Sequence, residues 1–238
     1  MENSGDGKVH MLVCLDALSP YSFFGLSVLL RYQEKWNLHL KFLPVLLGAV
    51  QKATGNKPPG ALPARAKWLA EDTERNARFM GVPFRGVPKG FGISLDSMRC
   101  QRVLTAIAES KGYDSKELAG AFMAFFRALF SVGLNHEVAI NDPSFLVKCC
   151  VSAGFTEAEA EQYVRASDDA ATKQRLKENT ELAVTKGMFG APTIYVSPVD
   201  KSKKGAREMM FFGSDRFEQM AWAIGKPWEG PNPPRSKL

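Results

Sequence analysis

Strand-like segments lie near both ends of this chain, and helical patterns fill about half of its length between them. Val9–Leu15 is a mostly apolar run of strand length, and residues 39–45 form a second strand pattern that opens with alternation. The helical pattern over 21–32 lies between them. These three segments predict a β-α-β unit with a right-handed crossover and two parallel strands.

The middle of the chain, after the turn-rich residues 54–60, carries repeated signals for helix starts. Proline or a capping side chain opens several segments, and Asp114 with Glu117 and Thr156 with Glu159 have the spacing of capping boxes. The predicted helices cover about 64–80, 97–111 and 114–130, with others beginning at 142 and 156 and one running from 168 or 171 to 185.

Strand character returns at 193–196 and 209–212, and the basic loop 201–207 joins the two segments into a predicted hairpin. Ser214 is predicted to cap a last helix that reaches about 224. The proline-rich residues 226–234 cannot be helical, so we expect an extended tail.

The collected order is β-α-β, then helices, then β-β-α. This order predicts an α/β protein with a thioredoxin-like fold, in which a large all-helical domain is inserted between the βαβ and ββα halves. We expect residues 1–55 and 186–238 to form the discontinuous thioredoxin-like domain, and 56–185 to form the helical insertion domain.

Composition excludes several classes of function. The net charge of +6 favours anionic ligands only in general terms, and the basic run lacks the stacking aromatics that nucleic-acid binding usually needs. No run of eighteen apolar residues suggests a membrane span, and the first residues do not resemble a signal peptide. The four cysteines form no C-x-x-C pair and the three histidines show no ligand spacing. We therefore expect neither a metal site nor a disulfide framework, and we expect the protein to reside in a reducing compartment.

The first candidate site is Ser19-Pro20-Tyr21-Ser22, which follows the first strand and opens the first helix. Serine is a good N-cap, and proline suits the first turn because its missing N–H would be unpaired there. A helix N-terminus favours a bound anion, and a hydroxyl there can donate a hydrogen bond to a thiolate. Capping alone also explains these residues, so both interpretations stay open.

Two more segments are expected at the same end of the sheet. Ala191-Pro192 precedes the third strand, and proline at this place in a thioredoxin-like fold is usually cis, which leaves the backbone of Ala191 free to pair with a peptide-like ligand. Ser214 and Asp215 open the last helix and can hold an amino acid's charged ends, or simply cap the helix. Their joint placement with the first helix start indicates a binding site.

Five segments carry a family resemblance: D-A-L-S-P-Y-S at 16–22, T-G-N-K-P-P at 54–59, F-G-A-P-T at 189–193, F-G-S-D-R at 212–216 and W-E-G-P at 228–231. In this order they resemble the kappa-class glutathione transferases, and the similarity spans about residues 9–235. Bacterial 2-hydroxychromene-2-carboxylate isomerases are close relatives of that family, and disulfide-bond oxidoreductases with a helical insertion are more distant ones.

The resemblance implies roles for residues of the first half of the chain. Ser19 resembles the catalytic serine that stabilises the glutathione thiolate, with Pro20 and Tyr21 in the adjoining contact segment. Asn56 resembles the asparagine that contacts glutathione from the loop after the second strand. Arg65 stands where relatives carry a basic residue, which implies a contact with the glycine carboxylate.

The same resemblance implies roles near the C-terminus. Ala191 takes the place of the residue before the cis-proline, here Pro192, that pairs with the cysteinyl backbone. The family often has a larger side chain there, but backbone pairing should survive the change. Ser214 and Asp215 resemble the pair that holds the γ-glutamyl end.

Serine instead of cysteine at positions 19 and 22 means that the chain supplies no attacking thiolate there. A hydroxyl can instead lower the pKa of a bound thiol by hydrogen bonding to its charged form. The resemblance therefore implies glutathione as co-substrate, with no metal, in conjugation to hydrophobic electrophiles for detoxification and in peroxide reduction. A glutathione-dependent isomerase and a non-catalytic glutathione-binding module stay open as alternatives.

Two further expectations concern assembly and location. The phenylalanine-rich helix within 118–134 is interpreted as buried core or as the interface of a homodimer, and alternatively as a wall of an apolar second-substrate pocket. Ser236-Lys237-Leu238 matches a peroxisomal address, so we expect the import receptor as a partner and the peroxisome as location, with cytoplasm or mitochondrion as alternatives.

Overall fold

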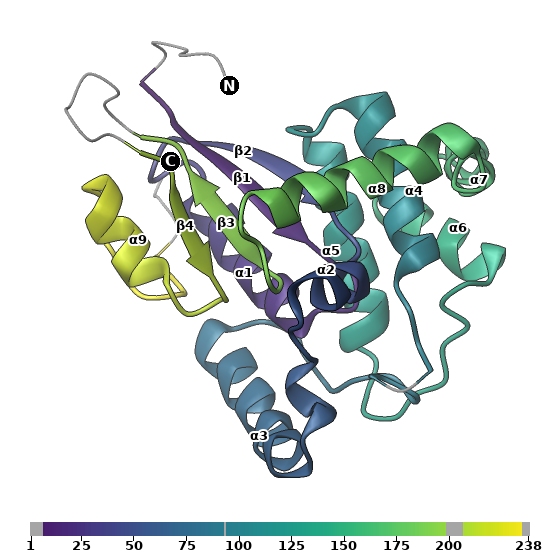
Figure 1. Ribbon diagram of the computed structural model, residues 1–238, viewed down its shortest axis with the longest axis horizontal. Coiled ribbons are helices and arrows are strands. Elements are labelled where there is room, and N and C mark those ends of the chain that lie inside the picture. The colour runs from purple at the N-terminus through teal and green to yellow at the C-terminus, as the bar shows by residue number, and fades with distance from the viewer. Residues whose placement is uncertain (1–6, 93, 199–206, 235–238) are drawn as a thin grey trace.

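The computed structural model describes residues 7–92, 94–198 and 207–234, and its centre is a four-stranded sheet (Figure 1). The strand order is β2 (Leu38–Pro44), β1 (Val9–Leu15), β3 (Thr193–Val196) and β4 (Met209–Phe212). β1 and β2 are parallel, whereas β3 is antiparallel to both of its neighbours. The predicted βαβ unit and hairpin are confirmed. The basic loop lies outside the described residues except for Arg207.

Helices cover both faces of this sheet. α1 (Pro20–Tyr32) and α9 (Phe217–Ile224) pack on one face, and α2 (Leu47–Thr54) and α8 (Ala170–Thr185) pack on the other. Successive side chains of β1 alternate between these two cores, as the period of a strand requires. The sheet is therefore buried on both sides, and its βα loops are held between helical layers.

The remaining helices stand beside the sheet and share its core. Buried residues of β1, α1, α4, α5 and α7 belong to one continuous apolar cluster. Phe122, Phe125, Phe126 and Phe130 are fully buried in it, which confirms the interpretation of this helix as core. The helices beside the sheet are η1 (Pro59–Ala61), α3 (Pro63–Met80), α4 (Met98–Lys111), α5 (Lys116–Phe130), α6 (Pro143–Ser152) and α7 (Glu157–Ala166).

The domain boundaries expected at 55/56 and 185/186 stay a prediction.

α2 has no local start signal in the sequence, because its first turn is stabilised by distant side chains rather than by a local cap. Its N-cap residue, Leu46, makes no side-chain cap hydrogen bond. Instead, the Leu46 N–H donates to Thr180 Oγ1 (3.1 Å) and the Leu47 N–H donates to Asp16 Oδ2 (2.8 Å). These partners lie 134 and 31 residues away, beyond the reach of a local pattern.

Two of the predicted caps, those of α5 and α9, are wrong, whereas that of α7 is confirmed. Ser115 caps α5 by accepting from the Leu118 N–H, while Asp114 pairs with His39 Nε2 at 3.0 Å. α9 begins at Phe217 without a side-chain cap, so Ser214 does not cap it. The Thr156–Glu159 capping box of α7 is present as predicted, because both of its reciprocal hydrogen bonds form.

One buried amide joins the sheet to the helical segment. Gln101 of α4 is fully buried; its Oε1 accepts from the Ala17 N–H (3.1 Å), and its Nε2 donates to the carbonyls of Leu15 (2.8 Å) and Val45 (2.6 Å). The side chain thereby satisfies the backbone where β1 and β2 end. No helix within the described residues is long and apolar enough to cross a membrane.

Replacing Gln101 by Met should lower the free energy of unfolding by about 2–4 kcal/mol, because three buried backbone groups lose their partner. Urea unfolding measures this change. Gln174→Met is the matched control: its amide bonds Glu178 on the exposed face of α8, and its loss should cost less than about 0.5 kcal/mol. Equal effects of the two changes would contradict a joining role for Gln101.

Candidate functional site

Ser19 links the start of α1 to the loop before β3. It is the N-cap residue, with extended backbone, and it is 4% exposed. Its Oγ accepts a hydrogen bond from the Ser22 N–H (3.1 Å) and donates one to the Ala191 carbonyl (3.1 Å). The predicted cap is present, and the same hydroxyl also reaches the second predicted segment.

The peptide bond between Ala191 and Pro192 is cis, as predicted. Within the described part of the chain, the Ala191 N–H has no hydrogen-bond acceptor, whereas its carbonyl accepts from Ser19 Oγ. The prediction that both backbone groups are free is therefore right for the N–H and wrong for the C=O. A peptide-like ligand can pair with the N–H directly, and with the C=O once the serine hydroxyl turns away.

Gly25 lets α1 approach the proline loop closely, and the sequence analysis missed it. A Cβ on Gly25 would lie 3.1 Å from Pro192 Cγ and 3.8 Å from Ser214 Cβ. Ser214, in the turn before α9, is 3% exposed and is buried against the same helix. Three of the predicted segments thus meet at one face of α1.

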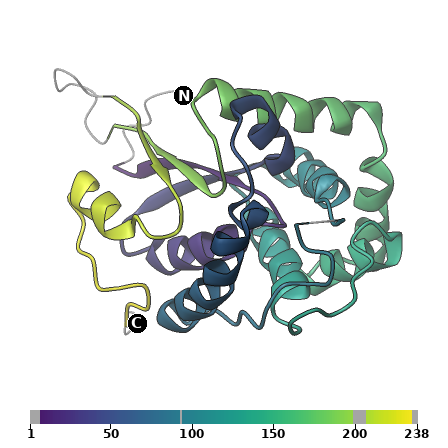
Figure 2. The same cartoon turned by 60° about the horizontal axis from the view of Figure 1, so that its bottom comes forward.

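Asn56, in the segment after α2, also contacts the loop that contains cis-Pro192. Its Nδ2 donates to the Phe189 carbonyl (2.7 Å), and its Oδ1 accepts from the Lys57 N–H (2.8 Å). Figure 2 shows the segment that carries it running from α2 to α3. The asparagine is exposed, so it forms part of the rim of the site rather than its floor.

Tyr21 lies close to two carboxylates, one of which the sequence analysis missed. Burial, followed by the nearby charges of Asp72 and Asp215, raises the pKa of the Tyr21 phenol to about 12. The phenol therefore stays protonated near neutral pH and can donate a hydrogen bond. Pro20, at the first position of α1, is buried beside it.

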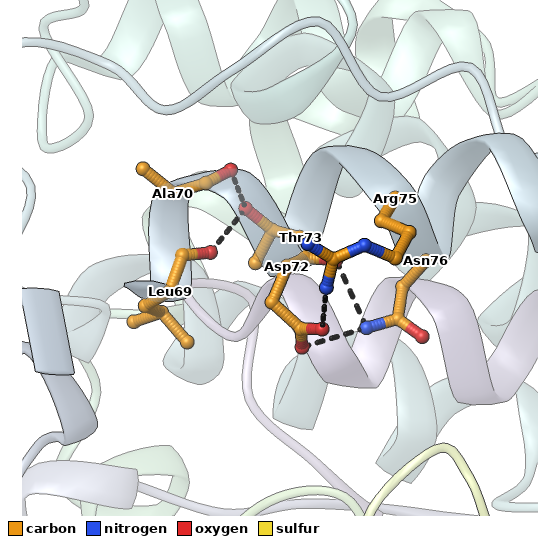
Figure 3. Close-up of polar contacts among 6 residues, drawn as sticks. All are labelled: Leu69, Ala70, Asp72, Thr73, Arg75 and Asn76. Carbon is orange, nitrogen blue, oxygen red and sulfur yellow. Dashed lines mark hydrogen bonds and ion pairs between the residues drawn. The ribbon is translucent and has the colours of Figure 1, made fainter. Parts of the chain in front are cut away.

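Asp72 is held in place by its own helix. Figure 3 shows its carboxylate accepting from Arg75 Nη1 (2.9 Å) and Asn76 Nδ2 (2.8 Å), and its side chain is 16% exposed. α3 packs against α1, which brings this carboxylate to Tyr21. In the sequence Asp72 is one of several acidic residues on a polar helix, so no local pattern distinguishes it.

Arg65 and Asp215 are the most open of the predicted residues. Arg65 lies in the first turn of α3 and is exposed. The Asp215 carboxylate is 62% exposed and lies 3.5 Å from Arg216 Nε. The structure therefore leaves both charges available to a ligand.

Asp16 is a fully buried carboxylate one turn before Ser19. It accepts hydrogen bonds from the N–H groups of Leu18 (2.8 Å) and Leu47 (2.8 Å) and from Ser97 Oγ (2.7 Å), and its own carbonyl accepts from the Ser19 N–H. Burial raises its pKa above the ordinary value of 3.8, against the opposing effect of these hydrogen bonds. Asp16 thus fixes the turn that presents Ser19.

The chain offers no reactive sulfur at this site. All four cysteines are free and buried, and burial raises the pKa of Cys14, Cys149 and Cys150 to about 12 and that of Cys100 well above its usual range. A raised pKa leaves the thiol protonated and unreactive. Among the described residues, no group of three histidine, cysteine or acidic side chains can hold a metal ion.

Comparison with known proteins places this geometry in a family. The model of the DsbA-like thioredoxin domain matches residues 12–225. The chain is 33% identical to human glutathione S-transferase kappa 1 over 222 residues, which is 92% of each protein. The chain belongs to the glutathione S-transferase kappa family. This membership agrees with the thioredoxin-like fold.

Relatives of the kappa family include isomerases. The chain is 24% identical to 2-hydroxychromene-2-carboxylate isomerase from Pseudomonas putida over 213 residues, covering 89% of this chain and 92% of the isomerase. A solved structure of a 2-hydroxychromene-2-carboxylate isomerase superposes with a TM-score of 0.70 at 21% identity, covering 91% of this chain and 94% of the other. This chain and the solved isomerase structure therefore share the same fold over nearly their whole lengths.

The raised pKa of Asp16 predicts a specific pH dependence. A carboxyl whose folded pKa lies above its unfolded value gives stability that is complete below the unfolded pKa of 3.8 and is lost as pH rises through the folded pKa. The unfolding free energy of the wild type minus that of Asp16→Asn should therefore fall as pH rises. Urea unfolding of both proteins between about pH 4 and pH 8 measures it. A difference that stays constant or grows with pH would contradict the prediction.

Proposed function

We propose that this kappa-family member binds glutathione at the N-terminus of α1 and activates its thiol for conjugation to electrophiles. The observation that carries the proposal is the Ser19 hydroxyl, buried at a helix N-terminus and hydrogen-bonded to the carbonyl before the cis-proline. A thiolate bound there would meet a hydroxyl donor and the positive end of the helix.

The hydrogen bonds of Ser19 suggest how binding and activation are coupled. A hydroxyl has one hydrogen and two lone pairs. The hydrogen now points to the Ala191 carbonyl, and one lone pair accepts from the Ser22 N–H. Rotation of the hydroxyl would direct its hydrogen to the glutathione sulfur and free the carbonyl to accept the cysteinyl N–H, without breaking the bond from Ser22.

Thiol activation requires a moderate free energy. A free thiol with a pKa of about 8.5 is mostly protonated near neutral pH, and lowering that pKa by about two corresponds to about 2.7 kcal/mol. A charge-assisted hydrogen bond contributes about 1.5–3 kcal/mol, and a helix N-terminus about 0.3–1 kcal/mol. The hydrogen bond from the Ser19 hydroxyl and the N-terminus of α1 together are therefore large enough to supply this free energy.

The remaining contacts hold the two ends of the tripeptide. We propose that the Ala191 N–H pairs with the cysteinyl carbonyl and that Ser214 and Asp215 hold the γ-glutamyl end. Asn56 contacts the backbone from the rim. Arg65, which is exposed in the first turn of α3, is assigned to the glycine carboxylate. The second substrate is an apolar electrophile, and peroxide reduction is a further reaction of the same thiolate.

Assembly and location complete the proposal. A homodimer, one interpretation of the phenylalanine-rich helix within 118–134, stays part of the proposal. Peroxisomal location, with the import receptor as partner, rests on Ser236-Lys237-Leu238, which lies outside the described residues. A role in detoxification would follow from conjugation to electrophiles.

Ser19→Ala should lower kcat/KM for conjugation of glutathione to a chloro-nitroaromatic by about tenfold to a hundredfold, because the thiolate loses a charge-assisted hydrogen bond. Initial rates measure the effect. Ser27→Ala is the matched control in the same helix: its Oγ donates to the Phe23 carbonyl (2.7 Å), so its removal should leave turnover unchanged. Full activity of Ser19→Ala would remove Ser19 from the mechanism.

Isomerisation is the second candidate function, favoured by the similarity to the isomerase from Pseudomonas putida. There the glutathione thiolate would add to an unsaturated substrate and leave again. The fate of glutathione separates the two reactions. We expect one free thiol to disappear for each electrophile converted, measured by thiol titration during turnover. Conversion of 2-hydroxychromene-2-carboxylate with no loss of thiol would favour the isomerase instead.

A further inference from the structure

Ser22, one turn into α1, carries a buried hydroxyl that no described group satisfies. The residue is 0% exposed, and its Oγ has no hydrogen-bond partner anywhere in the described part of the chain. An unsatisfied buried hydroxyl is unfavourable, and buried polar groups in native proteins nearly always find a partner. Its neighbour Ser27 behaves normally, since it donates to the carbonyl of Phe23 four residues earlier.

The position of Ser22 on the helix directs it to the proline loop. Side chains three residues apart share a face of a helix. Gly25 lies three residues after Ser22, and a Cβ there would meet Pro192 Cγ at 3.1 Å. Ser19 lies three residues before it and donates to Ala191. Ser22 therefore lies between two contacts to the same cis-proline segment.

We propose that the Ser22 hydroxyl donates a second hydrogen bond to the sulfur of bound glutathione, beside that of Ser19. The inference rests on the proposed function, because it needs a thiolate at the start of α1. A thiolate accepts several hydrogen bonds, and the Ser19 hydroxyl has only one hydrogen to give. The thiol proton goes to solvent, and no covalent bond is made or broken in this step.

This assignment explains why the unsatisfied hydroxyl is retained. In the free protein it is a destabilising group, and alanine fits the same space. In the complex it becomes a charge-assisted donor in a buried site, where such hydrogen bonds are strongest. Ser22 is then a catalytic residue. Its hydroxyl should destabilise the free protein and stabilise the complex with the glutathione thiolate.

The test compares Ser22→Ala with Ser27→Ala in the full-length protein. For Ser22→Ala we expect the ratio of bound thiolate to thiol at fixed pH to fall about tenfold, as the loss of one such hydrogen bond implies. Ultraviolet absorbance of the thiolate, with saturating glutathione, measures it. Affinity for S-methylglutathione, which has no thiolate, should stay unchanged. The Tm of the free variant should equal or exceed that of the wild type.

Ser27→Ala should show the reverse pattern, with an unchanged thiolate ratio and a lower Tm. An unchanged thiolate ratio in Ser22→Ala would overturn the assignment. A lower Tm, or failure to fold, would also overturn it, because it would mean that the hydroxyl is already satisfied in the free protein. If Ser19→Ala lowers the ratio and Ser22→Ala does not, only this inference fails. If neither variant lowers it, the proposed function fails as well.

Discussion

The hydrogen bond from Ser19 Oγ to the Ala191 carbonyl joins segments 172 residues apart, and the geometry of the site depends on it. It holds the N-terminus of α1 against the loop that contains cis-Pro192. Gly25, one and a half turns later, keeps the same helix close to that loop because it carries no Cβ. The sheet fixes both ends of this contact, since β1 leads into Ser19 and β3 follows Pro192.

The chemistry at this contact follows from which chemical groups the chain places there and which it does not. It supplies the hydroxyls of Ser19 and Ser22 at the positive end of α1. It offers no reactive thiol, since each of its four cysteines is buried and has a raised pKa. The carboxylates of Asp72 and Asp215 lie near Tyr21 and add negative charge beside this helix start. Such an arrangement suits a ligand that brings its own thiol together with a cationic amino group.

Local patterns predicted the parts of the fold whose signals are local. The strands and most helices follow from apolar runs and caps, whereas the cis-proline follows from its place in the predicted thioredoxin-like fold. α2 was missed because its first turn is capped by Asp16 and Thr180, which are distant in sequence. Asp72 was missed because only the packing of α3 on α1 distinguishes it from the exposed acids of the same helix. The nine predicted site residues rest on local patterns and on the family resemblance, and their roles stay predictions; no sequence pattern shows that Ser22 lacks a partner.

The central claim is that glutathione binds to this protein as a thiolate beside Ser19. Titration of the bound thiol in the wild type, followed by its ultraviolet absorbance against pH, tests this claim most directly. We predict a pKa well below the ordinary thiol value of about 8.5, so that the anion dominates near neutral pH. A bound thiol that titrates as it does in free glutathione would contradict the claim.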